Sequence, residues 1–199
     1  MSGCCIAPDG SPLVAVLAAG QASRFGGGKL DVMLCGKRVG QWGLDAVHAA
    51  GFAPGIIVVP DETPQFAQES GWSLQVNPNA RQGLGTSLAL AANRAMAQGR
   101  PLLVLLADMP LVSGKHLQRL GNGEGSAATV WPKGKAGVPA WIAPPLLPRL
   151  SALKSDAGAG ALLSSQADIA YVEADAAMLL DVDEPEDLDR AEALLSQRG

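Results

Sequence analysis

The stretch that decides the fold is "LVAVLAAGQASRFGGGK", residues 13–29. It begins with an apolar run of strand length and continues into a segment that holds four glycines, one arginine and one lysine. Because glycine costs backbone entropy, a cluster of glycines marks a loop where the backbone bends sharply or lies close to another group. Arg24 and Lys29 in this loop indicate that the neighbouring group is an anion.

Further apolar runs of strand length follow along the chain. The runs at 13–19, 55–60 and 101–108 are almost continuously apolar, which is typical of central parallel strands covered on both faces. Two more, at 127–131 and 169–174, also predict strands. The proline-rich segment between them, 132–148, is predicted to be a loop-rich excursion that contains one short strand.

Helical patterns separate these runs. Residues 40–50 and 86–98 are predicted helices, with Thr86 or Ser87 expected to cap the second one. A last helix is predicted near the C-terminus, with Pro185 close to its start. This alternation predicts an α/β fold with a doubly wound, Rossmann-like, mostly parallel sheet and helices on both faces.

Composition limits the classes of function. The net charge of −4 argues against a broad nucleic-acid-binding face, and no apolar run approaches the length of a membrane span. Three scattered cysteines and two histidines argue against a structural zinc site. Residues 1–12 lack signal-peptide features and are expected to form a flexible tail before one domain, 13–199, of a cytoplasmic protein.

Two familiar glycine loops do not fit. A Walker loop requires a glycine six residues before the lysine and a serine or threonine after it, where this chain has Ser23 and Leu30. The dinucleotide fingerprint requires a glycine at position 22, which is Ala22. A dinucleotide-dependent oxidoreductase is therefore disfavoured.

The loop instead resembles the signature of the MobA-like NTP transferases, the family of the molybdenum-cofactor cytidylyl- and guanylyltransferases. Leu17, Ala18, Ala19, Gly20, Arg24, Gly26 and Lys29 carry this resemblance, with Ser23 between Gly20 and Arg24. Three later segments follow in the order that the family has: "RQGLGTSLALA" (81–91), "LLADMPLV" (105–112) and "LLDVDEPEDLDRA" (179–191). The resemblance also implies a fold like that of the nucleotide-diphospho-sugar transferases.

The resemblance implies a nucleotide site and a role for each matching residue. Arg24 would bind the β and γ phosphates, and Lys29 would bind the α phosphate and the incoming nucleophile. The base and sugar would lie against the following residues: Leu17, Ala18, Ala19, Gly20, Gly83 and Ser87. Asp108 and Asp183 would hold Mg²⁺, and Asp183 has the alternative of simply capping the helix that follows it.

The acceptor side departs from the family pattern. "GVP" (137–139) stands where the cytidylyltransferases have Gly-His-Pro, "SDAGA" (155–159) replaces "GDxGA", and "GKRVGQW" (36–42) replaces "GKPLL". These changes leave the nucleotide half intact and put the acceptor in question. The segment "GGGKL", without an aspartate before the lysine, favours CTP over GTP.

The function that the resemblance implies is Mg²⁺-dependent transfer of a nucleoside monophosphate from CTP or GTP, with release of pyrophosphate. The expected acceptor is a phosphorylated pterin, molybdopterin, and a molybdoenzyme would receive the product. Two alternatives stay open: a transferase for a different phosphorylated acceptor, and a non-catalytic nucleotide or cofactor carrier that keeps the fold.

Overall fold

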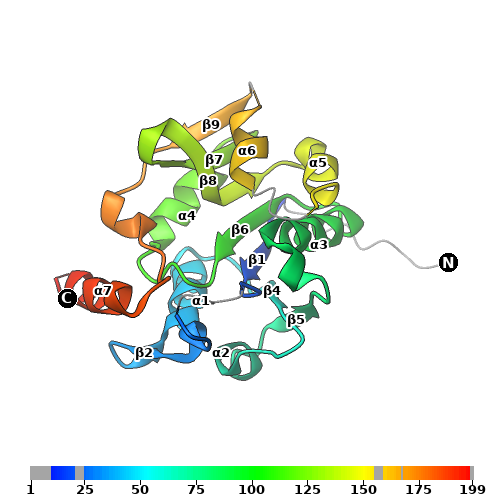
Figure 1. Ribbon diagram of the computed structural model, residues 1–199. Helices are drawn as coiled ribbons and strands as arrows, with labels where there is room; N and C mark the ends of the chain where they lie inside the picture. Colours follow the sequence, from blue (N-terminus) through cyan, green and yellow to red (C-terminus); the bar gives the residue numbers. More distant parts are fainter. Residues whose placement is uncertain (1–9, 21–24, 155–158, 167, 198–199) are drawn as a thin grey trace.

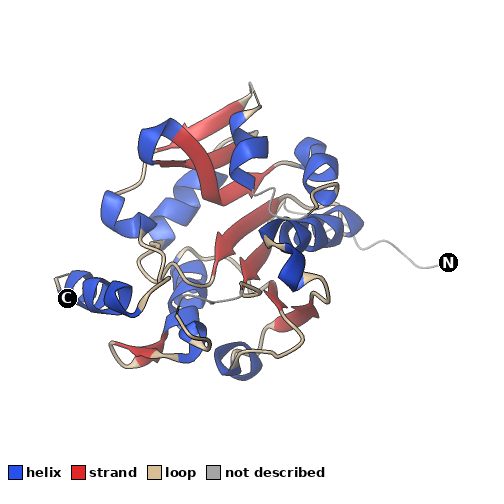
Figure 2. Ribbon diagram, in the orientation of Figure 1, coloured by secondary structure: helices blue, strands red, loops and turns tan. Residues whose placement is uncertain are grey.

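The structure is a computed structural model that describes residues 10–20, 25–154, 159–166 and 168–197. A seven-stranded sheet forms its central layer, in the order β5-β4-β1-β6-β8-β7-β9, with helices outside it (Figures 1 and 2). The strands of this sheet are β1 (Leu13–Leu17), β4 (Ile56–Val59), β5 (Ser73–Val76), β6 (Leu102–Leu106), β7 (Ser126–Trp131), β8 (Lys135–Ile142) and β9 (Ile169–Val172). Strands β2 (Met33–Leu34) and β3 (Lys37–Arg38) form a separate antiparallel hairpin.

The helices are α1 (Val39–Ala49), α2 (Gln65–Glu69), α3 (Leu84–Ala97), α4 (Gly114–Gly121), α5 (Leu147–Ser151), α6 (Ala159–Ser164) and α7 (Pro185–Ser196). Short 3₁₀ turns are η1 (Lys29–Asp31), η2 (Ala80–Gln82), η3 (Pro132–Gly134), η4 (Pro144–Leu146) and η5 (Ala176–Leu179). None of the helices within the described residues is long and apolar enough to cross a membrane.

The predicted doubly wound, mostly parallel sheet is confirmed. Strand β1 pairs in parallel with both β4 and β6, and β5 extends the parallel set beyond β4. The chain therefore runs outward from β1 to β5 and then returns through α3 to β6, on the other side of β1. In open α/β sheets, such a reversal opens a crevice at the carboxyl ends of the two central strands, where ligands bind.

The core has one part on each face of the sheet because alternate residues of each strand point to opposite sides. Val14 and Val16 of β1 pack in the part that contains α1 and α4, and Leu13 and Leu17 pack in the part that contains α3 and α5. Strands β4 and β6 alternate in the same way and are buried on both faces, which explains their continuous apolar sequences.

The segment 132–148 differs from its prediction. It contains the eight-residue strand β8, which lies between β6 and β7 and is antiparallel to both. The pairing with β7 shifts register between Ala128 and Thr129, opposite Val138 and Pro139. Because proline has no N–H to donate, it is accommodated in a sheet at such an irregularity. The prolines and glycines of this segment are typical of a loop, and they are the reason that the long strand was not predicted at its full length.

The start of α3 also differs. The N-cap is Gly83, with φ of 113°, so Thr86 and Ser87 lie inside the first turn and do not cap the helix as predicted. Thr86 Oγ1 instead donates a hydrogen bond back to the carbonyl oxygen of Gly83, 2.9 Å away. The other predicted strands and helices are present with small shifts at their ends. The elements that were not predicted are α2, α4, α5, α6, the β2–β3 hairpin and the edge strand β5.

His116 ties α4 to the β7–β8 pair. Its Nε2 lies 2.8 Å from Thr129 Oγ1, and that hydroxyl donates its proton to the carbonyl oxygen of Pro139 at 2.6 Å. Because the hydroxyl proton is used there, Nε2 must carry the proton of the imidazole. Burial, followed by the charge of Arg119, lowers the pKa of His116 to about 4. The folded protein therefore holds this histidine neutral.

We expect this histidine to make folding pH-dependent. The folded-state pKa of His116, about 4, lies below the ordinary 6.5. The contribution of the neutral imidazole to the free energy of folding is therefore complete above pH 6.5 and is lost as the pH falls towards 4. That loss is about 3 kcal/mol by pH 4. Urea unfolding would measure the free energy of unfolding of His116→Gln and of the wild type at pH 7 and at pH 4. The loss of unfolding free energy caused by the substitution should be smaller at pH 4 than at pH 7. His48→Gln, at an exposed histidine on α1, is the control, and a constant difference for His116→Gln would contradict the prediction.

Candidate active site

The glycine loop begins at the carboxyl end of β1. Ala18 N donates to the carbonyl oxygen of Val58 on one side, and Ala107 N donates to the carbonyl oxygen of Leu17 on the other. The exit from β1 is therefore fixed between β4 and β6. Residues 21–24, which include Ser23 and Arg24, lie outside the described residues, so the phosphate contacts expected of Arg24 stay a prediction.

The second half of the loop requires glycine because of its backbone conformation. Gly26, Gly27 and Gly28 have φ of 84°, 102° and 64°, a region that other residues adopt only with strain. A Cβ at any of the three would meet no other described atom within 4 Å. The glycines therefore serve the path of the chain and leave bare backbone towards the cavity beside them.

Lys29 follows directly and is the centre of the site. It is only 5% exposed. Its Nζ lies 2.6 Å from Asp108 Oδ2 and 2.9 Å from Asp183 Oδ1. Burial alone would lower the pKa of Lys29, but the charges and hydrogen bonds of Asp108 and Asp183 outweigh burial and raise the pKa above 10.5. Lys29 is therefore a buried, charged ammonium with two carboxylate partners.

The two aspartates come from segments that are distant in the sequence. Asp108 lies just beyond the carboxyl end of β6, and Asp183 lies just before α7. The N–H of Val182 donates to the carbonyl oxygen of Asp108 at 2.9 Å, which joins the two segments. Since both carboxylates contact the same Nζ, they also lie close to one another, as the shared metal site predicted from the sequence requires.

The side chain of Asp183 does not cap α7, which was the alternative role predicted for it. The N-cap of α7 is Glu184, and Glu184 and Asp187 form a reciprocal capping box. Asp187 Oδ2 accepts the backbone N–H groups of both Asp183 and Glu184. The carboxylate of Asp183, half of which is exposed, is thus available to Lys29.

Asp181 is a residue that the sequence analysis missed. Asp181 Oδ1 and Asp108 Oδ1 are buried, and neither has a hydrogen-bond partner among the described residues. Burial, followed by the charges of Asp108 and Asp183, raises the pKa of Asp181 to about 7. Asp181 lies two residues before Asp183, with the buried Val182 between them. This spacing is the sequence signal from which Asp181 could have been predicted.

The donor set fits a hard divalent cation in part. The carboxylate oxygens of Asp108 and Asp183 are the ligands that Mg²⁺ prefers, and Asp108 Oδ1 is a buried acceptor with no described donor. No group of three or more His, Cys, Asp or Glu residues within the described part of the chain is placed to hold a metal alone. This agrees with the common Mg²⁺ arrangement in which one or two carboxylates act together with substrate phosphates and water.

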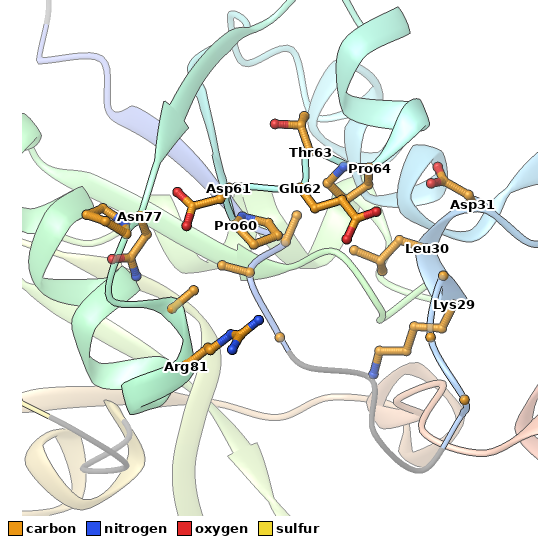
Figure 3. A pocket seen from close by; sticks show the side chains of 18 residues that line it. Lys29, Leu30, Asp31, Pro60, Asp61, Glu62, Thr63, Pro64, Asn77 and Arg81 are labelled. Atoms are coloured by element: carbon orange, nitrogen blue, oxygen red, sulfur yellow. The ribbon is translucent and has the colours of Figure 1, made fainter.

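A cavity of about 1110 Å³ lies beside Lys29, between the glycine loop, the loop after β4 and the segment before α3. Ala18, Ala19, Gly20 and Lys29 of the predicted site line it. Figure 3 shows Lys29 and Arg81 extending into the space from opposite sides, with Asp61 and Glu62 on a third. Leu17, Gly83, Ser87, Asp108 and Asp183 are not among its described lining residues.

Ser87 is connected to this cavity through Asn77. Asn77 lines the cavity, and its Nδ2 donates to Ser87 Oγ at 2.8 Å and to Thr86 Oγ1 at 2.9 Å. Ser87 itself is buried. The base contact expected of Ser87 therefore stays a prediction, and Asn77 is a polar lining residue that the sequence analysis did not single out.

Nucleotidyltransferases are the class of protein that this fold and this site define. The crevice at the sheet reversal, the glycine-lined wall and the lysine–carboxylate cluster are features suited to an anionic nucleotide. The chain belongs to the family described as the MobA-like NTP transferase domain, which matches residues 14–185. The predicted family, the fold class and the enzyme class are thereby confirmed.

Individual proteins are similar to this chain over most of its length. The purine catabolism protein PucB of Bacillus subtilis (strain 168) is 29% identical over 197 residues, covering 90% of this chain and 95% of PucB. The crystal structure of Rv0371c from Mycobacterium tuberculosis H37Rv has a TM-score of 0.74 at 23% identity, covering 92% of this chain and 99% of that one. Molybdopterin-guanine dinucleotide biosynthesis protein A from Archaeoglobus fulgidus has a TM-score of 0.61 at 21% identity, covering 92% and 98%.

Asp181 yields a prediction for the protein without ligands. Its folded-state pKa of about 7 lies above the ordinary 3.8, so its stabilising contribution is present below pH 3.8 and is lost as the pH rises through 7. Asp181→Asn should therefore raise the melting temperature clearly at pH 8 and little at pH 4, measured with a chelator present. Asp189→Asn, at an exposed position of α7, is the control. An equal effect of Asp181→Asn at both pH values would contradict the assigned proton.

Proposed function

We propose that the protein transfers a nucleoside monophosphate from CTP, or less readily GTP, to a phosphorylated acceptor, with molybdopterin as that acceptor. The observation that carries the proposal is the Lys29–Asp108–Asp183 cluster at the carboxyl ends of the central strands, beside a large cavity. The volume of that cavity, about 1110 Å³, is at the upper end for small-molecule sites, so it has room for a nucleotide and a second substrate.

The reaction needs no covalent enzyme intermediate. An oxygen of the acceptor phosphate attacks the α-phosphorus, a new P–O bond forms, and the bond between the α-phosphorus and the bridging oxygen breaks. Pyrophosphate leaves with that oxygen and its electron pair. The protein must therefore align the two substrates and neutralise the negative charge that develops on the phosphate oxygens.

The chain supplies groups for each of these tasks. The backbone of Ala18, Ala19 and Gly20 would hold the base and sugar, together with Gly83 and Ser87, as the resemblance to the family implies. The ammonium of Lys29 would stabilise the α phosphate and the incoming oxygen, and the planar fork of Arg24 would bind the β and γ phosphates. Asp108 and Asp183 would hold a divalent cation, which supplies further positive charge at the phosphates when bound.

The similar proteins support parts of this proposal. Rv0371c has also been crystallised in complex with manganese, in a structure that has a TM-score of 0.71 with this chain at 23% identity. The name of the Archaeoglobus protein refers to molybdopterin-guanine dinucleotide, which favours a pterin acceptor. The name of PucB refers to purine catabolism. Our proposal also includes a cytoplasmic reaction and a molybdoenzyme as recipient of the product.

The proposal is tested by measuring pyrophosphate release with Mg²⁺, each of the four ribonucleoside triphosphates and molybdopterin. We expect release with CTP, weaker release with GTP, and none without the acceptor. Release only with another phosphorylated acceptor would favour the alternative acceptor. Tight triphosphate binding without release would favour the carrier, and a preference for NADH over every triphosphate would contradict the nucleotide site.

The metal ligands yield a graded prediction. Asp108→Asn should lower Mg²⁺-dependent turnover by about 10²–10³-fold, as the loss of a single charge-stabilising group does in other enzymes. Asp183→Asn should have a smaller effect, because its side chain is 51% exposed against 19% for Asp108 and is more easily replaced by water. Turnover would be measured over a range of Mg²⁺ concentrations, with the exposed Asp189→Asn as control. Equal turnover in all three variants would show that the metal is held elsewhere.

A further inference from the structure

Lys29 occupies one oxygen of each of the two carboxylates that a divalent cation would need. Its Nζ lies 2.6 Å from Asp108 Oδ2 and 2.9 Å from Asp183 Oδ1, one oxygen from each carboxylate assigned to the metal. The side chain of Lys29 is only 6% exposed, so water and salt screen these contacts far less than they screen surface pairs. An ammonium and a metal ion cannot both contact the same oxygen face at these distances.

The ammonium cannot leave these carboxylates without a replacement partner. Separating a buried ion pair leaves charges without compensation, which is strongly unfavourable. A free cation that approached the site would have to push the ammonium away from two carboxylates that contact it at 2.6 and 2.9 Å. A triphosphate changes this situation, because its oxygens bring negative charge into the cavity that Lys29 already lines.

The backbone at Lys29 indicates that the side chain, not the loop, makes the exchange. Asp31, two residues later, accepts the N–H of Gln65 at 2.9 Å and the N–H of Phe66 at 2.7 Å, which anchors η1 to the start of α2. The four-carbon stem of lysine can rotate its ammonium while the backbone stays in place. Lys29 also lines the cavity, on the side opposite Arg81 (Figure 3).

We propose that Lys29 is an exchangeable counter-ion that keeps Asp108 and Asp183 from binding a free divalent cation, so that the site accepts the cation together with the triphosphate. On arrival of a metal–triphosphate complex, Lys29 transfers from the carboxylates to the phosphate oxygens, and the carboxylates become free for the cation. This inference rests on the proposed nucleotidyl transfer and specifies that its substrate is the metal–triphosphate complex. It assigns Lys29 opposite effects on two measurable quantities, turnover and free-metal affinity.

The first test is a titration of the ligand-free protein with Mn²⁺, followed by electron paramagnetic resonance. Lys29→Met removes the charge and keeps the length of the side chain. We expect this variant to bind Mn²⁺ roughly tenfold more tightly than the wild type, or better, because its carboxylates have lost their competing cation. The same variant should lose most of its turnover.

A matched control is available in the same chain. Lys37 pairs with Asp45 on the hairpin side of α1, away from the cavity, so Lys37→Met also removes a paired lysine. It should leave the Mn²⁺ affinity unchanged. Lys29→Met combined with Asp108→Asn should lose the gain in affinity. Equal or weaker Mn²⁺ binding by a folded Lys29→Met variant, with folding checked by circular dichroism, would overturn the proposal.

A second test uses the wild type and does not depend on the folding of a variant. A CTP analogue with a methylene group between the α and β phosphorus atoms should raise the affinity of the protein for Mn²⁺, after correction for the Mn²⁺–analogue complex in solution. The coupling is reciprocal, so Mn²⁺ must raise the affinity for the analogue by the same factor. Tight Mn²⁺ binding by the wild type alone, unchanged by the bound analogue, would overturn the proposal.

These outcomes are separable from a failure of the proposed function. If no triphosphate supports pyrophosphate release, the transfer reaction is wrong, whatever the metal affinities are. If release occurs but Lys29→Met shows no gain in Mn²⁺ affinity, the reaction stands and the counter-ion role of Lys29 is wrong.

Discussion

The constraint on which the rest of the site depends is the buried charge of Lys29. A buried ammonium is tolerated only when carboxylates compensate it, and removal of one partner typically costs about 3–5 kcal/mol. Asp108 and Asp183 provide that compensation from the end of β6 and the start of α7. The contacts of Lys29 with the two aspartates therefore join the first, middle and last parts of the chain at one point. They hold α7 in position in addition to the packing of Ala191 in the core.

That point has its position because of the sheet. Strand β1 lies between β4 and β6, and its backbone is bonded to both neighbours at the exit of the glycine loop. Three successive left-handed glycines then return the chain across the end of the sheet, so Lys29 lies next to Asp108. The sheet reversal thus forms the crevice, and the glycines form a wall of exposed backbone. The ion pairs of Lys29 lie at one side of the crevice.

The two halves of the sheet differ in the direction and regularity of their strand pairing. The nucleotide half is a run of parallel strands whose apolar sequences are explained by burial on both faces. The half that holds β7, β8 and β9 is mixed, and its irregular pairing at Thr129 is held by a buried chain of hydrogen bonds from His116 through Thr129 to Pro139. The departure from the family pattern at residues 137–139 lies in this half, whereas the departure at 36–42 lies in β3 and the start of α1.

The sequence by itself determined the family, the doubly wound fold and the glycine loop, because these depend on local patterns: continuous apolar runs, helical periodicity and glycines next to a lysine. It could also mark Lys29, Asp108 and Asp183 one by one, each by a short motif. It could not show that Lys29 neutralises both aspartates, since Lys29 and Asp183 are 154 residues apart in the chain. It missed Asp181 because an aspartate becomes unusual only when it is buried beside other charges. It predicted only a short strand where β8 lies, because proline and glycine are tolerated where strand pairing shifts. Only the tertiary structure decides which charges share a volume from which water is excluded.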